Sequence, residues 1–188
     1  MALTSTLVPL GMSAPHFALA DVGGDQHSLA DFTAPVLVVA FVCNHCPYVK
    51  HLEDELGTFK PSADLDIVAI SSNDIERYPD DAPAELAKQA ERAGWQFPYL
   101  LDADQIVAQQ YGAVCTPDFF VYGPDRALSY RGAFDASTPG NGIPVTGEAL
   151  RHAIALIGKG QAVPEPHRPS MGCGIKWLPG NEPEANSA

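Results

Sequence analysis

The amino-acid sequence predicts an α/β fold in which helices flank a central mixed β-sheet. Two apolar segments, residues 35–42 and 65–71, have the pattern of core strands; the first is apolar throughout, as in strands buried on both faces. Later, two short apolar segments flank Gly123-Pro124-Asp125 and predict a strand pair. The resulting order is strand, helix, strand, helix, strand, helix, hairpin, helix, which is typical of α/β proteins.

The first half of the chain begins with a lead-in that contains a Gly-Gly turn between two short strand-like segments, which indicates a hairpin. A helix follows the first core strand, and its apolar residues have the spacing of a buried stripe. The elements expected here are a hairpin of residues 17–21 and 26–29 around Gly23-Gly24, a strand over 35–42, a helix from Cys46 to Phe59 with Val49, Leu52 and Leu56 on one face, and a strand over 65–71.

The second half alternates short helices and strands. Proline in the first turn and glycine after the last turn are the expected helix boundaries. The elements expected here are a helix from Pro83 to Gly94, a strand over 98–102, a helix from Ala103 to Tyr111 stopped by Gly112, strands over 119–122 and 127–130, and a helix from Thr146 to Ile157.

The domain organisation is predicted to be one domain over residues 1–160 with a C-terminal extension over residues 161–188. The extension is rich in proline and glycine but contains Ile175 and Trp177, which a disordered tail rarely carries together. We therefore expect the extension to dock on the domain, with residues 178–188 free to be disordered.

Composition and charge exclude several classes of function. A net charge of −12 over 188 residues argues against nucleic acid or an anionic membrane as partner. No apolar stretch is long enough for a membrane span, and the N-terminus has no basic residue or long apolar run typical of a secretory signal. Four cysteines are too few for a disulfide scaffold. The expected compartment is the cytoplasm.

The motif Cys43-Asn44-His45-Cys46-Pro47 lies between the first core strand and the helix after it. A Cys-x-x-Cys at a helix N-terminus has its thiolate stabilised by unpaired N–H groups, and its two sulfurs can form a small disulfide ring. We expect Cys43 to be the more acidic thiol and the nucleophile, with Cys46 resolving. A cationic His45 would stabilise the thiolate further. Half of a zinc site is the alternative, but the motif occurs once, so neither metal nor cofactor is expected.

Two further cysteines are candidates for the same chemistry. Cys115 precedes Thr116-Pro117, and a proline at a strand entry often marks a fixed turn. Cys115 alone is most often a small buried hydrophobe, whereas its position beside the proline allows a redox role. Cys173, between two glycines, is expected to be a reachable thiol that can resolve an oxidised sulfur; a packed structural thiol is the alternative.

These residues together resemble the thioredoxin superfamily, in its redoxin (AhpC/TSA, peroxiredoxin-like) branch, and within it a subgroup that keeps a thioredoxin-type Cys-x-x-Cys. The resemblance covers residues 15–175, almost the whole globular part. Its motifs are Gly11-x-x-Ala14-Pro15-x-Phe17-x-Leu19-x-Asp21, Cys43 to Tyr48, Ile70-Ser71-Ser72-Asn73-Asp74, Tyr111 to Phe120, Tyr130-Arg131-Gly132 and Gly172 to Trp177.

The resemblance implies a thioredoxin-like fold in which Thr116-Pro117 is the cis-proline loop facing the Cys-x-x-Cys, with Cys115 nearby. The sequence departs from both parent patterns. Leu37 stands where thioredoxins have a buried carboxylate, and Cys43 stands where peroxiredoxins have the threonine that orients peroxide.

The leading hypothesis is therefore a thiol–disulfide oxidoreductase that uses Cys43 and Cys46 on protein or small-thiol substrates. The first alternative is a thiol-dependent, antioxidant peroxidase with Cys46 as the peroxidatic cysteine. The second is a non-catalytic metal- or thiol-binding module. Thr116, Pro117, Cys115 and Cys173 complete the set of candidate catalytic residues.

Overall fold

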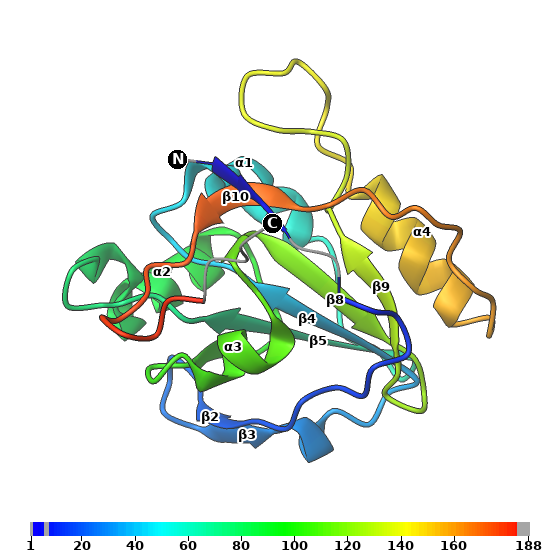
Figure 1. The fold of residues 1–188 in the computed structure, drawn as a ribbon, viewed down its shortest axis with the longest axis horizontal. Helices are drawn as coiled ribbons and strands as arrows, with labels where there is room; N and C mark the ends of the chain where they lie inside the picture. The colour runs from blue at the N-terminus through cyan, green and yellow to red at the C-terminus, as the bar shows by residue number, and fades with distance from the viewer. Residues whose placement is uncertain (1, 6–7, 184–188) are drawn as a thin grey trace.

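The centre of the molecule is a five-stranded mixed sheet (Figure 1). The computed structural model describes residues 2–5 and 8–183. In sheet order the strands are β6 (Tyr99–Leu101), β5 (Leu65–Ser71), β4 (Val36–Phe41), β8 (Asp118–Tyr122) and β9 (Leu128–Gly132). The first three are parallel, and β8 and β9 join them antiparallel. The predicted mixed sheet is confirmed.

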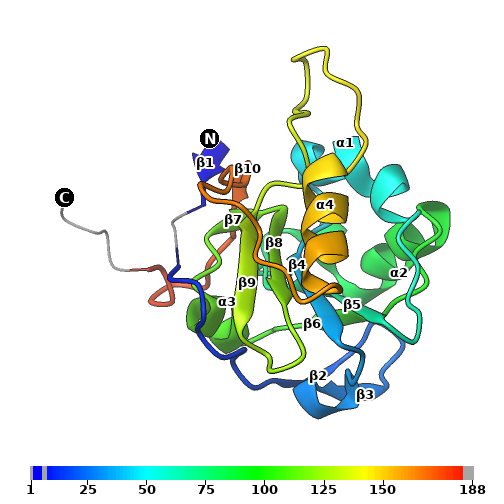
Figure 2. The same cartoon turned by 90° about the vertical axis from the view of Figure 1, so that its right-hand side faces the viewer.

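Helices cover both faces of this sheet (Figure 2). One face packs against α1 (Pro47–Leu56), α2 (Pro83–Arg92) and α4 (Glu148–Ile157), and the other against α3 (Ile106–Tyr111). The predicted hairpin is confirmed as β2 (Ala18–Ala20) and β3 (Gln26–Ser28), and it lies on the α3 side. Strand β4 supplies alternate residues to the two apolar layers, which explains its continuous apolar sequence.

Some helices are shorter than predicted. Helix α1 ends at Leu56 instead of Phe59, and the next residue, Gly57, lies so close to Ala93 that a Cβ on it would be 1.9 Å from the Ala93 carbonyl oxygen. Helix α3 begins at Ile106 instead of Ala103, because Gln105 has a positive φ of 65° and the buried Asp102 carboxylate accepts the N–H groups of Val107 and Ala108 in the first turn.

A second, three-stranded sheet lies at one end of the molecule and was not predicted. It consists of β1 (Ala2–Thr4), β10 (Met171–Gly174) and β7 (Cys115–Thr116), in that order and all antiparallel. After α4 the chain crosses the body to reach this sheet (Figure 1). Strands β1 and β10, from the two ends of the chain, lie side by side there (Figures 1 and 2).

The C-terminal extension docks on the body, as predicted. Ile175 is buried in the core on the α3 side, and Trp177 packs against it at the edge. Leu178 donates its N–H to Gln105 at 2.7 Å. Of the residues for which disorder was expected, 184–188 lie outside the described part of the chain. Among the described residues, none of the helices has the length and apolar character to span a bilayer.

Candidate redox site

The Cys-x-x-Cys lies in the connection from β4 to α1, as predicted. Cys46 is the N-cap of α1, and Pro47 occupies the first helical position. Cys43 lies outside the helix, two residues after β4 ends at Phe41. The orphan N–H groups of the helix therefore lie near Cys46 and not near Cys43, because the helix starts only after the second cysteine.

The two thiols lie against the proline loop that the family resemblance implied would face them. The Thr116–Pro117 bond is cis. The Cys43 Sγ is 3.2 Å from the Thr116 hydroxyl, and the protonated Cys46 thiol can donate to the Thr116 carbonyl oxygen, also at 3.2 Å. Cys43 and Cys46 are hydrogen-bonded to one another, and all four cysteines are free thiols. The predicted juxtaposition of the pair with Thr116 and Pro117 is confirmed.

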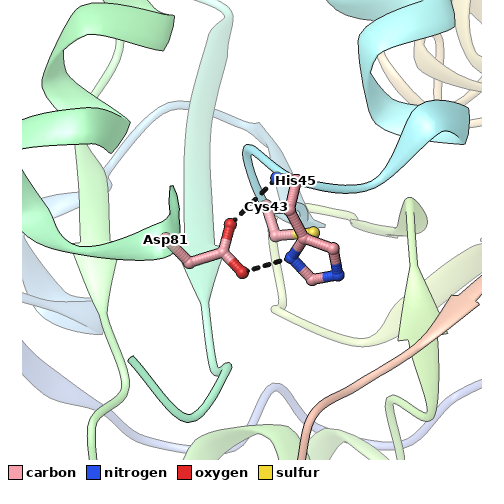
Figure 3. A group of neighbouring side chains, drawn as sticks. All are labelled: Cys43, His45 and Asp81. Carbon is pink, nitrogen blue, oxygen red and sulfur yellow. Dashed lines mark hydrogen bonds and ion pairs between the residues drawn. The ribbon is translucent and has the colours of Figure 1, made fainter. Parts of the chain in front are cut away.

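Asp81 is a site residue that the sequence did not reveal. It ends the 3-10 helix η2 (Pro79–Asp81), and its side chain is fully buried under the motif (Figure 3). One oxygen accepts the backbone N–H groups of Asn44 and His45, at 2.7 and 3.0 Å. The other lies 2.5 Å from His45 Nδ1 and accepts the side-chain amide of Asn73 at 2.7 Å. Asp81 thus fixes the two residues between the cysteines.

Asp81 carries a negative charge into the site. Burial alone would raise the pKa of its carboxyl, but the hydrogen bond and charge of His45, together with Asn73 and the backbone, lower the pKa overall. The position at which thioredoxins have a buried carboxylate is occupied by the apolar Leu37. In this chain Asp81, on the 3-10 helix η2, supplies a buried carboxylate instead.

The acidities of the two thiols are opposite to the sequence-based prediction. Burial, the hydrogen bond with Cys46 and the charge of Asp81 raise the pKa of Cys43 well above its ordinary value. The hydrogen bond from Cys43, with others from Cys173 and the Val49 N–H, outweighs burial and lowers the pKa of Cys46 to about 5. The assignment of Cys43 as the more acidic thiol is therefore wrong, because the helix N-terminus and the hydrogen-bond donors surround Cys46.

His45 is a partly buried residue held in one orientation. Its ring stacks on Tyr78 with centroids 5.2 Å apart, its Nδ1 faces Asp81, and its buried Nε2 has no hydrogen-bond partner. One ligand atom each from Cys43, His45 and Asp81 lies within 4.8 Å of the others, a spacing that a metal ion could use (Figure 3). Both Asp81 oxygens already accept protein hydrogen bonds, so an ion there would have to displace them.

A polar network from α2 supports the motif from behind. Gln89 donates to the Cys43 carbonyl oxygen at 3.2 Å and to Glu53 at 2.9 Å. Arg92 forms a 2.9 Å ion pair with Glu53 and donates to the Asn44 side chain at 2.8 Å. In sequence these residues look like the solvent-facing positions of two helices, so their pattern does not distinguish them from ordinary surface residues.

The other two cysteines differ in environment. Cys115 is completely buried, and burial raises the pKa of its thiol far above the ordinary value, which keeps it protonated. Cys173 is partly exposed and hydrogen-bonded to Cys46, and burial and this contact raise its pKa to about 11. The structure thus places a third thiol directly beside the pair.

Comparison with known proteins gives the following matches. Residues 10–131 match the AhpC/TSA family. The chain is 27% identical over 119 residues to the "Thiol-disulfide oxidoreductase ResA" of Geobacillus thermodenitrificans, covering 62% of this chain and 64% of that protein. It is 34% identical over 122 residues to the "Putative peroxiredoxin Rv2521" of Mycobacterium tuberculosis, covering 60% and 69%.

Solved structures show the same fold. A hypothetical protein from Sinorhizobium meliloti superposes with a TM-score of 0.90 at 43% identity, over 94% of this chain and 99% of that chain. An uncharacterized conserved protein from Geobacillus kaustophilus gives 0.91 at 46% identity, over 95% and 97%. A secreted disulfide oxidoreductase of Mycobacterium tuberculosis superposes with a TM-score of 0.58 at 16% identity, over 74% of this chain and 94% of that chain. The thioredoxin-like fold is confirmed.

Proposed function

The chain belongs to the AhpC/TSA family, and on that premise we propose that it is a thiol–disulfide oxidoreductase in which Cys46 is the reactive thiolate and Cys43 the resolving thiol. The observation that carries this proposal is the hydrogen-bonded pair of thiols with opposite pKa shifts, lying against cis-Pro117. An oxidoreductase of this class needs one sulfur that is ionised near neutral pH and a second within reach of it.

The reaction follows from this asymmetry. The Cys46 thiolate attacks one sulfur of a substrate disulfide, forms a mixed disulfide and releases the other substrate sulfur as a thiol. Cys43 then attacks Cys46 in the mixed disulfide, closes the Cys43–Cys46 bond and expels the second substrate thiol. Two electrons pass from the dithiol to the substrate. The Thr116 hydroxyl, 3.2 Å from Cys43, supports the thiolate that Cys43 must form to resolve.

Turnover with a small disulfide tests the function directly. With dithiothreitol as reductant, the wild-type protein is expected to accelerate reduction of bis(2-hydroxyethyl) disulfide. Cys46→Ser should lose at least 100-fold in rate, because the reactive thiolate is gone. With Cys173 also replaced by alanine, Cys43→Ser should still attack and should accumulate the mixed disulfide on Cys46, which mass spectrometry detects, because neither Cys43 nor Cys173 remains to resolve it. Full turnover by Cys46→Ser, or a mixed disulfide on Cys43 in that variant, contradicts the proposal.

A peroxidase is the second candidate, because Cys46 is the thiolate, caps a helix and precedes a proline. In this reaction the Cys46 thiolate attacks peroxide to give a sulfenic acid, and Cys43 condenses with it to form the disulfide and water. Stopped-flow oxidation of the reduced protein by hydrogen peroxide separates the candidates. We expect a rate constant within tenfold of free cysteine thiolate; a value several orders of magnitude higher favours the peroxidase.

For partners and compartment, we propose protein disulfides or small thiols in the cytoplasm, with no nucleic acid or membrane among the ligands. The net charge of −12 and the cysteine usage support this assignment. Subcellular fractionation with thiol trapping tests it: recovery of a reduced protein from the soluble cytoplasmic fraction is the expected result, and recovery from an oxidising compartment is the contrary one.

A further inference from the structure

Strand β10 lies along the edge of the proline loop, beside the reactive pair. It pairs antiparallel with β7, so that Cys173 stands opposite Thr116, the residue that precedes cis-Pro117. Its other edge pairs with β1 (Figure 2). An extended segment added to an open strand edge is a common way for a polypeptide to bind a protein. Here the chain's own C-terminal extension occupies that edge.

The sequence of β10 is fitted to this position. A Cβ on Gly172 would lie 1.9 Å from the Thr116 carbonyl oxygen and 3.1 Å from Pro117 Cδ, so only glycine allows the approach. Hydrogen bonds fix the strand on both sides: the Ser170 hydroxyl donates to the Gly132 carbonyl oxygen at 2.7 Å, and the Lys176 N–H donates to the Asn73 side chain at 2.8 Å. The register of Cys173 is therefore set by its neighbours.

The cysteines differ in access to solvent. Cys43 and Cys46 are 0% exposed, whereas Cys173 packs on the same apolar cluster and remains partly exposed. The Cys173 thiol and its backbone N–H both contact the Cys46 sulfur. Thiol–disulfide exchange requires a thiolate to reach the sulfur that it attacks. Of the three sulfurs, that of Cys173 is therefore the most accessible to a reductant from solution while β10 is docked.

We propose that Cys173 is the third redox thiol of this site, which transfers the disulfide from the buried Cys43–Cys46 pair to the surface, where an external thiol reduces it. This inference rests on the proposed function. It differs from the expectation of a mobile resolving arm, because the structure holds Cys173 in a strand at a fixed position beside Cys46.

Each step is an exchange that balances. The Cys173 thiolate attacks Cys46 in the Cys43–Cys46 disulfide; the Cys46–Cys173 bond forms, the Cys43–Cys46 bond breaks, and Cys43 takes up the proton that Cys173 lost. An external thiolate then attacks the Cys173 sulfur and forms a mixed disulfide with it, and Cys46 leaves as a thiolate. A second external thiol releases Cys173 and carries away both oxidising equivalents as its own disulfide. The low pKa of Cys46 makes it the favoured leaving group in the second step.

The test uses Cys43→Ser. In this variant the partly exposed Cys173 is the thiol that remains beside Cys46 to form a disulfide with it. The reduced variant is treated with one equivalent of diamide, quenched in acid, alkylated and mapped by mass spectrometry. We expect a Cys46–Cys173 disulfide as the main product. Recovery of Cys173 as fully alkylated thiol, with Cys46 as an adduct or oxidised acid, overturns the proposal.

A kinetic experiment tests the same transfer while Cys43 and Cys46 are both present. After oxidation, Cys173→Ala should contain the Cys43–Cys46 disulfide, and its reduction by glutathione should be at least tenfold slower than in wild type. Met171→Ala, a change on an exposed side chain of the same strand, is the matched control and should behave as wild type. An unchanged rate in Cys173→Ala overturns the inference. Failure of the Cys43–Cys46 disulfide to form in any variant contradicts the proposed function instead.

Discussion

Asp81→Asn is expected to lower the free energy of unfolding of the reduced protein by about 3 kcal/mol, the scale for removing one charged partner from a buried hydrogen-bonded group. The carboxylate accepts four hydrogen bonds at the motif, from two backbone N–H groups and from His45 and Asn73. An amide has one acceptor oxygen, and its NH₂ group would face donors. Urea unfolding at pH 7 measures the change.

Asp80→Asn is the matched control, because Asp80 is exposed and the substitution removes the same charge. It should change the unfolding free energy by less than about 0.5 kcal/mol. The acid limb gives a second check. The pKa of Asp81 is lowered in the folded state, so its contribution is present above the unfolded value of about 3.9 and is lost as pH falls below it. The difference in free energy of unfolding between wild type and Asp81→Asn should therefore disappear in acid. Equal stability of wild type and Asp81→Asn at pH 7 would contradict this role.

The parts of the fold that the sequence predicted are those with a local signal. Strand β5 coincides with its predicted bounds, and β4 lies within its own, because both are continuous apolar segments in a buried sheet. The small sheet of β1, β10 and β7 had no such signal. Strand β7 has two residues, and its partners come from the two ends of the chain, so only the complete fold defines it.

The candidate site likewise has a part that the sequence predicted and a part that it did not. Cys43, Cys46 and the Thr116–Pro117 loop were predicted from their motifs and are brought together. The acidity of the thiols could not be predicted, because it depends on burial and on contacts that only the folded chain makes. Cys46 is hydrogen-bonded by Cys43 and Cys173, and Cys43 is affected by the charge of Asp81, which looks in sequence like one of several surface acids. The Pro79-Asp80-Asp81 sequence, an acidic turn after a core strand, was the available signal.

The low pKa of Cys46 also affects the balance between the dithiol and the disulfide form of the protein. A thiolate that is stabilised in the reduced protein favours the dithiol over the disulfide, so the couple is more oxidising than one with ordinary thiols. Because the pKa of Cys46 falls from 9.0 to about 5 on folding, the stabilisation of the reduced form is present above pH 9 and is lost as pH falls toward 5. The raised pKa of Cys43 acts at the alkaline end, where its contribution to stability is lost as the pH rises above 9.

The proposed mechanism depends on Cys46, and not Cys43, being the thiolate at neutral pH. The direct measurement is titration of the thiolate ultraviolet absorbance of the reduced protein, compared among wild type, Cys46→Ser and Cys43→Ser; absorbance needs no reagent to reach the buried sulfurs. We expect a transition with a midpoint near pH 5 in wild type that is absent from Cys46→Ser. In Cys43→Ser the transition should persist, because the serine hydroxyl can still donate a hydrogen bond to the Cys46 sulfur. A low-pH transition that survives in Cys46→Ser and disappears in Cys43→Ser would show that Cys43 is the thiolate and would overturn the proposed mechanism.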